Sequence, residues 1–193
     1  VYSLLQIVIP LTEDAVATTV RARGDELGRW FGGHVQELHR YASQTVIRSG
    51  ELDEIQAYLA EQAQSLHPEA RLLIYADWDG NHVTSDGSTI DDIQAQDYYI
   101  GIVRGARVSA VGAASISTEG SAPYVTVAHE VRGVDGRIRG IIAQTIESST
   151  IDDVVAGIQP TRSSFAIVAD LDSNVAAHPD QSKILSFNLR RSD

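Results

Sequence analysis

The spacing of apolar residues changes from helical to strand-like about a third of the way along the chain. From residue 12 to residue 50, apolar side chains recur at every third or fourth position, which is the period of one face of an α-helix. Thr12 and the two acidic residues after it favour a helix N-terminus. The pattern therefore predicts one continuous helix that ends at Ser49 and Gly50, roughly 50 Å long. A second helix is predicted over residues 52–66, before Pro68.

Beyond Pro68 the apolar residues alternate with polar ones, which is the period of a β-strand. The alternation predicts five strands, at residues 72–77, 82–85, 107–116, 124–131 and 137–146. Short turns rich in Gly, Ser and Asp join the later strands, so neighbours should be antiparallel. A short helix is expected at residues 97–105, after the second strand. Helices followed by an antiparallel run of strands predict an α+β fold.

One short phrase occurs twice, as IYADWDGN at residues 74–81 and as IVADLDSN at residues 167–174. Each copy predicts a strand, a tight turn and a returning strand, because Gly, Asn and Asp tolerate the backbone angles of such turns. Tandem modules or two hairpins of one sheet would both produce this repeat. A helix predicted at residues 150–158, ended by Pro160, precedes the second copy.

Composition excludes several classes of function. The chain has 26 acidic against 15 basic residues, a net charge of −11, which disfavours binding to nucleic acids. It has no cysteine, so a disulfide framework and a thiolate site are excluded. Its six histidines are scattered, and Asp77 and Asp79 lack the distant Glu of a calcium-binding loop, so we expect no metal. No nucleophile elbow or phosphate-binding loop is present, so we do not expect an enzyme.

The first eleven residues are apolar but fewer than the ~20 that span a bilayer. Two interpretations stay open: the outer end of a membrane helix, or the start of a helix that packs on the domain. The predicted helix that follows contains Gly24, Gly28, Gly32 and Gly33, which either permit close approach of a second helix or mark a kink. We therefore expect that the chain can form a homodimer through this helix.

The ordered set of motifs resembles a known family. The set is the DWDGN hairpin, Asp97-Tyr98-Tyr99, the STEG turn at 117–120, and the strands VTVAHEVR and RIRGII. This order is similar to the membrane-distal module of double-Cache domains, which are extracytoplasmic sensors of bacterial chemoreceptors, histidine kinases and diguanylate cyclases. The resemblance implies a PAS-like antiparallel sheet on a long N-terminal helix. It divides the chain into that helix (1–50), the membrane-distal module (51–160), and the start of a membrane-proximal module or a closing hairpin (161–193).

The resemblance also implies a ligand site between the sheet and residues 88–105. Amino-acid-binding members have Arg and Trp-Tyr near the short helix, Tyr-x-Asp on the next strand and Asp on the last strand. The matching positions here hold Gln96, Tyr98-Tyr99, Ala114 with Ile116, and Thr145. The candidate ligand-binding residues are Gln96, Tyr98, Tyr99, Ser115 and Thr145. Because Gln and Thr carry no charge, we expect a ligand other than an α-amino acid, and we expect no cofactor.

Two functions remain at this point. The first is the extracytoplasmic, ligand-sensing input domain of a membrane-anchored bacterial signalling receptor. The alternative is a structural or dimerisation domain of such a receptor with no small-molecule ligand. A hollow beside Tyr98 and Tyr99 would favour the first, and a site filled by side chains would favour the second.

Overall fold

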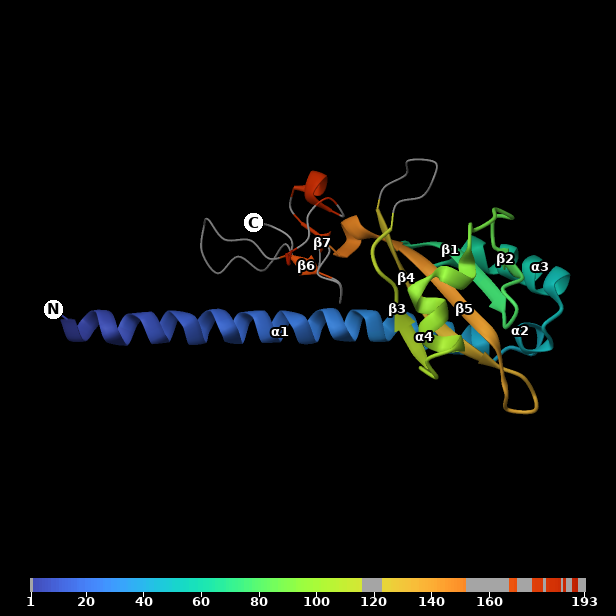
Figure 1. Ribbon diagram of the computed structural model, residues 1–193, viewed down its shortest axis with the longest axis horizontal. Coiled ribbons are helices and arrows are strands. Elements are labelled where there is room, and N and C mark those ends of the chain that lie inside the picture. The colour runs from blue at the N-terminus through green and yellow to red at the C-terminus, as the bar shows by residue number, and fades with distance from the viewer. Residues whose placement is uncertain are drawn as a thin grey trace.

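The computed structural model describes residues 2–115, 123–151, 167–169, 175–178, 180–184, 186 and 189–190. The long helix α1 (Tyr2–Ala42) comes first, followed by α2 (Thr45–Ser49) and α3 (Leu52–Gln62), which continues into one 3₁₀ turn. Figure 1 shows that only the C-terminal part of α1 lies against the sheet, while its N-terminal part projects away from it.

Five strands form one antiparallel sheet in the order β2-β1-β5-β4-β3. These strands are β1 (Ala70–Asp77), β2 (His82–Thr84), β3 (Ser109–Val111), β4 (Tyr124–Arg132) and β5 (Ile138–Glu147). The short helix α4 (Asp97–Val103) lies between β2 and β3 in sequence. The prediction of an α+β fold with an antiparallel sheet and a helix after its second strand is therefore confirmed.

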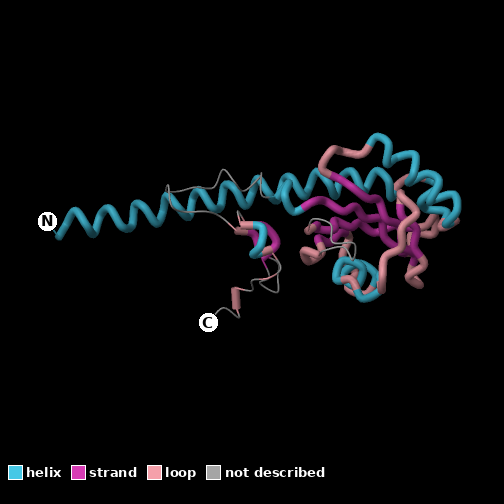
Figure 2. The backbone as a smooth tube through the Cα atoms, turned by 90° about the horizontal axis from the view of Figure 1, so that it is seen from above, coloured by secondary structure: helices cyan, strands magenta, loops and turns pink. Residues whose placement is uncertain are grey.

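The sheet lies between two layers of helix. Figure 2 shows α1, α2 and α3 on one face and α4 on the other. We call these the α1 face and the α4 face. Strand alternation divides the apolar side chains between them, because successive residues of a strand point to opposite sides. The near-continuous apolar runs in β1 and β5 reflect burial on both faces.

The α1 face carries the larger core. Leu73 and Tyr75 of β1 and their neighbours on β4 and β5 pack against the three N-terminal helices. The fully buried members of this core are Leu38, Ile47, Ile55, Leu59, Leu73, Tyr75, Val127, Val131, Ile142 and Ile146. Burial of each such side chain contributes about 1.5–3 kcal/mol, so this core holds the helices in place.

The first helix differs from its prediction at both ends. It starts at Tyr2, so Thr12 lies inside the helix and the expected N-terminus there is wrong. The helix also runs through Pro10, although an interior proline removes one backbone hydrogen bond and crowds the preceding turn. It breaks before Thr45, because Gln44 is extended and its N–H bonds to the Tyr41 carbonyl three residues back. The helical segment that ends at Gly50, which has a φ of 81°, is therefore the separate helix α2.

Other boundaries also moved. The second helix ends at Gln62 and continues as a 3₁₀ turn over Ala63–Ser65. The strand predicted at 107–116 shrinks to β3 and an isolated bridge at Ser115, and between them the Gly112 N–H still donates to the Thr126 carbonyl. Of the helix predicted at 150–158, the structure describes residues 148–151 as helical, and the remainder lies outside the described residues.

The two copies of the repeated phrase form hairpins in different sheets. The first copy spans β1 and β2, as predicted. The second contributes β6 (Val168–Ala169) and β7 (Val175–Ala177), which pair only with each other among the described residues. Val168 packs on a small cluster that also receives Leu27 and Trp30 of α1. The second hairpin and the long helix therefore pack against the same small cluster.

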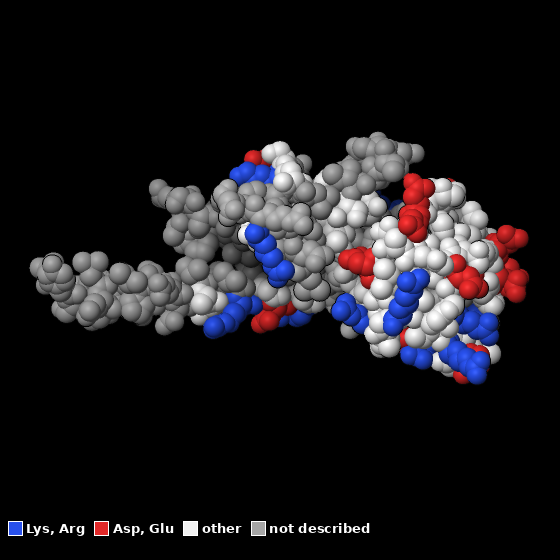
Figure 3. All heavy atoms as spheres, in the orientation of Figure 1, with Lys and Arg blue, Asp and Glu red and all other residues white. Residues whose placement is uncertain are grey.

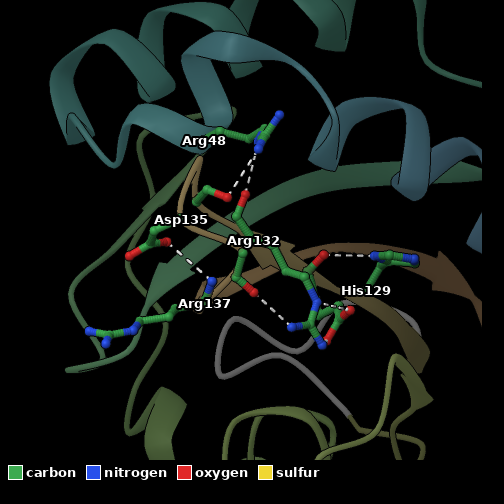
Figure 4. Close-up of polar contacts among 8 residues, drawn as sticks. Arg48, His129, Arg132, Asp135 and Arg137 are labelled. Carbon is green, nitrogen blue, oxygen red and sulfur yellow. Dashed lines mark hydrogen bonds and ion pairs between the residues drawn. The ribbon is translucent and has the colours of Figure 1, made fainter.

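The turn between β4 and β5 fixes the register of the sheet centre. Figure 4 shows Arg48 of α2 donating to the Arg132 and Gly133 carbonyls, at 2.9 and 3.0 Å, while Arg132 pairs with Glu130. Arg132 lies opposite Ile138, whereas Val131 lies opposite Gly140, so Arg139 is an extra, bulged residue. This bulge shifts the pairing of every residue beyond it by one position.

Candidate ligand-binding face

The α4 face has a row of small side chains beneath its helix. Ala110 of β3 lies opposite Ala128 of β4, which lies opposite Ala143 of β5, and all three are buried. Methyl groups on three adjacent strands leave space above the sheet for large rings. The aromatic side chains of Tyr98 and Tyr99 from α4 belong to this cluster. The predicted placement of the paired tyrosines over the sheet is therefore observed.

Tyr99 has a structural role. Its side chain is 1 % exposed, and its hydroxyl lies 2.8 Å from the carbonyl oxygens of both Asp77 and Trp78, to which it donates. Burial, followed by the nearby Asp77 carboxylate, raises the pKa of this phenol. The neutral hydroxyl thus fastens α4 to the turn between β1 and β2.

Tyr98 is different, because its hydroxyl has no hydrogen-bond partner in the part of the chain that the structure describes. The side chain is 5 % exposed, and burial raises the pKa of its phenol well above the ordinary value, with Tyr124 adding to the shift. Its ring packs against Gly112, where an added Cβ would lie 2.8 Å from the ring. A neutral, unpaired hydroxyl beside a bare backbone is suited to meet a ligand.

Asp97 sets the position of Tyr98. One carboxylate oxygen accepts from the Tyr98 N–H and the other from the Ala113 N–H, both at 2.7 Å. The first bond satisfies a free N–H at the helix start, and the second holds the segment after β3. Asp97 therefore links α4 to the backbone that borders the site.

Two threonines lie on the sheet near Tyr98. Thr145 of β5 lies directly opposite Thr126 of β4, and alternation places both on the α4 face. Their side chains are 9 % and 3 % exposed. The Thr126 carbonyl accepts from the Gly112 N–H at 2.7 Å, next to the Tyr98 ring. The row thus brings together an aromatic hydroxyl and two aliphatic hydroxyls.

Two charged side chains, Glu147 of β5 and Arg71 of β1, lie beyond the threonines. Glu147 follows Thr145 on the same face and lies opposite Tyr124. Its carboxylate forms an ion pair with Arg71, the residue at the irregularity in β1. Arg71 is largely exposed and Glu147 is partly buried. This end of the α4 face therefore has one group of each charge beside its hydroxyls.

The remaining candidates lie at the edge of this region. Gln96 has the extended backbone of an N-cap residue, and its carbonyl accepts from the Ile100 N–H at 3.0 Å. Its half-buried side chain makes no hydrogen bond among the described residues. Ser115 bridges Tyr124, which places it beside the Glu147 end of the face. The structure thus gathers Tyr98, Ser115 and Thr145, while Tyr99 faces the β1–β2 turn.

Sequence reasoning missed Tyr124, Thr126, Asp97, Glu147 and Arg71. For Glu147 a signal was present, since strand alternation places residues 145 and 147 on one face. The pairing of Thr126 with Thr145 needed the bulge at Arg139, which no residue pattern announced. Ile116, one of the positions matched to the family pattern, lies outside the described residues.

The charges on this side of the molecule are mixed. Figure 3 shows acidic and basic side chains interspersed over the sheet region, without a continuous basic patch. The part of the chain that the structure describes contains no group of three acidic or histidine side chains able to hold a metal ion. Within the same part, none of the helices combines the length and apolarity needed to cross a membrane.

Neither a comparison with descriptions of known protein families nor a search of curated protein sequences finds a match to this chain. Solved structures do match. The ligand-binding domain of the Pseudomonas fluorescens chemoreceptor CtaA, in complex with L-serine, superposes with a TM-score of 0.66 at 14% identity, over 86% of this chain and 71% of that domain. The ligand-binding domain of the Pseudomonas aeruginosa PAO1 receptor PctB, in complex with L-Gln, superposes with a TM-score of 0.68 at 14% identity, over 89% of this chain and 70% of that domain. The ligand-binding domain of PctC from the same organism, in complex with GABA, has a TM-score of 0.68 at 15% identity, over 90% of this chain and 78% of that domain.

These neighbours correct one expectation. Serine and glutamine are α-amino acids, so the inference that excluded this class from the missing Arg and Asp is contradicted by domains of the same fold. The neighbours are sensor domains of chemoreceptors rather than enzymes, and they are of the Cache type with a PAS-like fold. The resemblance drawn from the sequence is confirmed at the level of the fold. The chain has the PAS-like fold of these chemoreceptor ligand-binding domains.

Proposed function

We propose that this chain is the extracytoplasmic, ligand-sensing input domain of a bacterial transmembrane receptor. The observation that carries the proposal is the shared fold, which in CtaA, PctB and PctC accommodates small molecules. It is supported by the α4 face, where the buried Tyr98 ring lies beside Thr126 and Thr145 and its hydroxyl makes no hydrogen bond among the described residues.

The ligand class we propose is an amino acid or a close relative that carries both an ammonium and a carboxylate. The carboxylate of such a ligand can accept from the Tyr98 and threonine hydroxyls and pair with the Arg71 guanidinium. Its ammonium can pair with Glu147. The Arg71–Glu147 ion pair then takes the place of the charges that Gln96 and Thr145 lack. Gln96 and Ser115, at the two edges, are proposed to contact the ligand side chain.

Signalling requires that the ligand bind one sheet geometry better than another. The central strand β5 offers a direct connection, because Thr145 faces the proposed ligand while its neighbour Gln144 contacts α1 on the other face. A small displacement of β5 would therefore reach the long helix, the element that projects from the sheet (Figure 1).

The second hairpin belongs to the same proposal. Its strands β6 and β7 form their own sheet, which is consistent with residues 161–193 opening a second module after the helix and the membrane-distal module. The repeated phrase in β1–β2 and β6–β7 then reflects two related modules.

The test is calorimetric titration of the domain with each L-amino acid and with GABA. We expect at least one to bind and to raise the melting temperature. Tyr98→Phe should lower the affinity for that ligand roughly 2- to 10-fold, which is the effect of one lost hydrogen bond. Glu147→Gln, which removes a charged partner, should weaken it about tenfold or more.

Tyr75→Phe is the matched control. Tyr75 is also buried and its hydroxyl also lacks a partner among the described residues, but it lies on the α1 face. We expect the Tyr75→Phe variant to bind the ligand with unchanged affinity. If no compound binds, or if Tyr75→Phe weakens binding as much as Tyr98→Phe, the proposed site is wrong.

A further inference from the structure

On the face opposite the proposed ligand site, a buried histidine joins α1 to the central strand of the sheet. His34 of α1 is 6 % exposed, and its Nδ1 lies 2.7 Å from the amide nitrogen of Gln144 on β5, which is fully buried. On the other side of the ring, Nε2 lies 3.4 Å from Oε2 of Glu69. The imidazole is therefore held between two polar groups, one from the central strand β5 and one from the segment before β1.

The protonation state of this ring follows from the donors around it. The amide nitrogen of Gln144 can only donate, so Nδ1 of His34 must be the acceptor and carry no proton. The ring proton is then on Nε2, directed to Glu69. The same carboxylate oxygen accepts from Nε1–H of Trp30 at 3.0 Å. In this state His34 is neutral.

The Gln144 amide retains one unused group. Its Oε1 is buried and has no hydrogen-bond partner among the described residues. A proton arriving at Nδ1 of His34 would face the amide N–H donors at 2.7 Å, an arrangement that cannot form a hydrogen bond. If the amide turns over, Oε1 faces the new N–H and accepts from it, but the amide nitrogen then loses its partner. The contact between α1 and β5 thus has two arrangements, selected by one proton.

We propose that His34 is a proton-binding site that makes the attachment of α1 to the sheet depend on external pH, through reversal of the Gln144 amide. The domain would then respond to acidity as well as to its ligand. The link to ligand signalling rests on the proposed function, since Gln144 adjoins Thr145. Proton binding itself is tested without any ligand, so that the two can fail separately.

The charges around His34 set the range in which it titrates. Burial lowers its pKa below 6.5 and is the largest effect. Glu69, from the segment before β1, and Glu37, on α1, raise the pKa, whereas His67 lowers it, and its ring lies 5.8 Å from that of His34. From β5 the facing group is the neutral Gln144. The proton site is therefore empty at neutral pH and fills on acidification.

Trp30 provides an optical readout, because its ring lies 4.6 Å from that of His34 and a protonated imidazole quenches a neighbouring indole. The chain has two tryptophans, and the other, Trp78, is exposed. In a Trp78→Phe background, lowering the pH should quench the remaining fluorescence in one step with a midpoint below 6.5. His34→Gln should abolish the step. His39→Gln, an exposed histidine on the same helix, should leave it intact.

A fourth variant tests the role of Gln144. Gln144→Glu places a carboxylate against Nδ1, which favours the charged ring, so the midpoint should rise above that of the parent. Nitrogen NMR of the His34 ring should show the Nε2–H form at neutral pH. A step that survives His34→Gln, a midpoint at or above 6.5 in the parent, an Nδ1–H ring, or a midpoint unmoved by Gln144→Glu would each overturn the proposal.

Discussion

Adjacent tyrosines with the same sequence neighbourhood have different roles in this fold. Tyr98 and Tyr99 follow each other in α4, and both are buried. The Tyr99 hydroxyl donates to two backbone carbonyls, whereas the Tyr98 hydroxyl makes no hydrogen bond among the described residues. From the sequence, both tyrosines could be placed in a short helix. Which ring fastened the helix depended on the position of the β1–β2 turn, a contact 21 or 22 residues away.

A pair of substitutions separates satisfied from unsatisfied buried hydroxyls. Tyr75 is fully buried, and burial raises the pKa of its phenol to about 12. Its hydroxyl has no hydrogen-bond partner in the described part of the chain. We expect Tyr75→Phe to leave the free energy of unfolding unchanged or to raise it by up to about 1 kcal/mol, because it removes an unpaired buried group.

Tyr99→Phe removes a hydroxyl that donates to the backbone, and should lower the free energy of unfolding by about 1 kcal/mol. Both values come from denaturant unfolding at neutral pH. Equal losses in the two variants would contradict the assignment of the Tyr75 hydroxyl as unpaired.

At the scale of elements, the glycines distinguish the free from the packed parts of the molecule. Gly28 of α1 is exposed, and a Cβ added there would meet nothing within 4 Å. Gly140 of β5 is buried and lies opposite Asp77 at the end of the neighbouring strand β1. A Cβ added there would collide with the Ala76 carbonyl oxygen. The sequence placed several glycines on the first helix, without showing which surface each of them faces.

Gly28→Ala should therefore stabilise the domain by up to about 1 kcal/mol, the difference in helix propensity between the two residues. Gly140→Ala should destabilise it by about 1–3 kcal/mol or more, through overpacking against the backbone. Thermal unfolding followed by circular dichroism measures both. A loss of stability in Gly28→Ala would show that another surface, such as a second copy of the chain, lies against this part of α1 in solution, as the predicted homodimer requires.

The β4–β5 hairpin shows what element-level reasoning could not reach. Its turn was predicted from Gly133 and Gly136, and the structure gives Gly136 the positive φ of 77° that such a turn needs. The bulged Arg139 then shifts the register by one residue. Without it Thr126 would lie opposite Gln144, and Thr145 would face α1 instead of lying beside Thr126. The extra residue is stabilised by tertiary contacts, including the bond from Trp78 N–H to the Arg139 carbonyl.

For the molecule as a whole, two buried histidines line the contact between α1 and the sheet. Besides His34, His129 of β4 is 6 % exposed and its ring lies 5.1 Å from that of His39 on α1. Burial lowers the pKa of both His34 and His129 below the ordinary value of 6.5. The unfolded chain, with ordinary values, therefore binds more protons than the folded one in the range below 6.5.

Stability should consequently be highest above pH 6.5 and should fall as the pH drops through that value toward the two lowered pKa values. The measurement is the melting temperature between pH 8 and pH 5. The double variant His34→Gln/His129→Gln should show a flatter profile over this range, whereas His39→Gln should retain the fall. A wild-type profile that is flat, or that rises toward acid, would show that these rings are not held neutral by the fold.

The sequence by itself determined the order of elements and their periods, because these depend on local propensity and on the alternation of apolar and polar residues. That order was enough to predict a long first helix, an antiparallel sheet and an α4 segment across it. Only the tertiary structure decided which side chains meet, since Thr126, Thr145 and Glu147 become neighbours through a one-residue bulge, and His34 reaches Gln144 across 110 positions. Such contacts depend on register and packing between distant segments, and no local pattern along the chain encodes them.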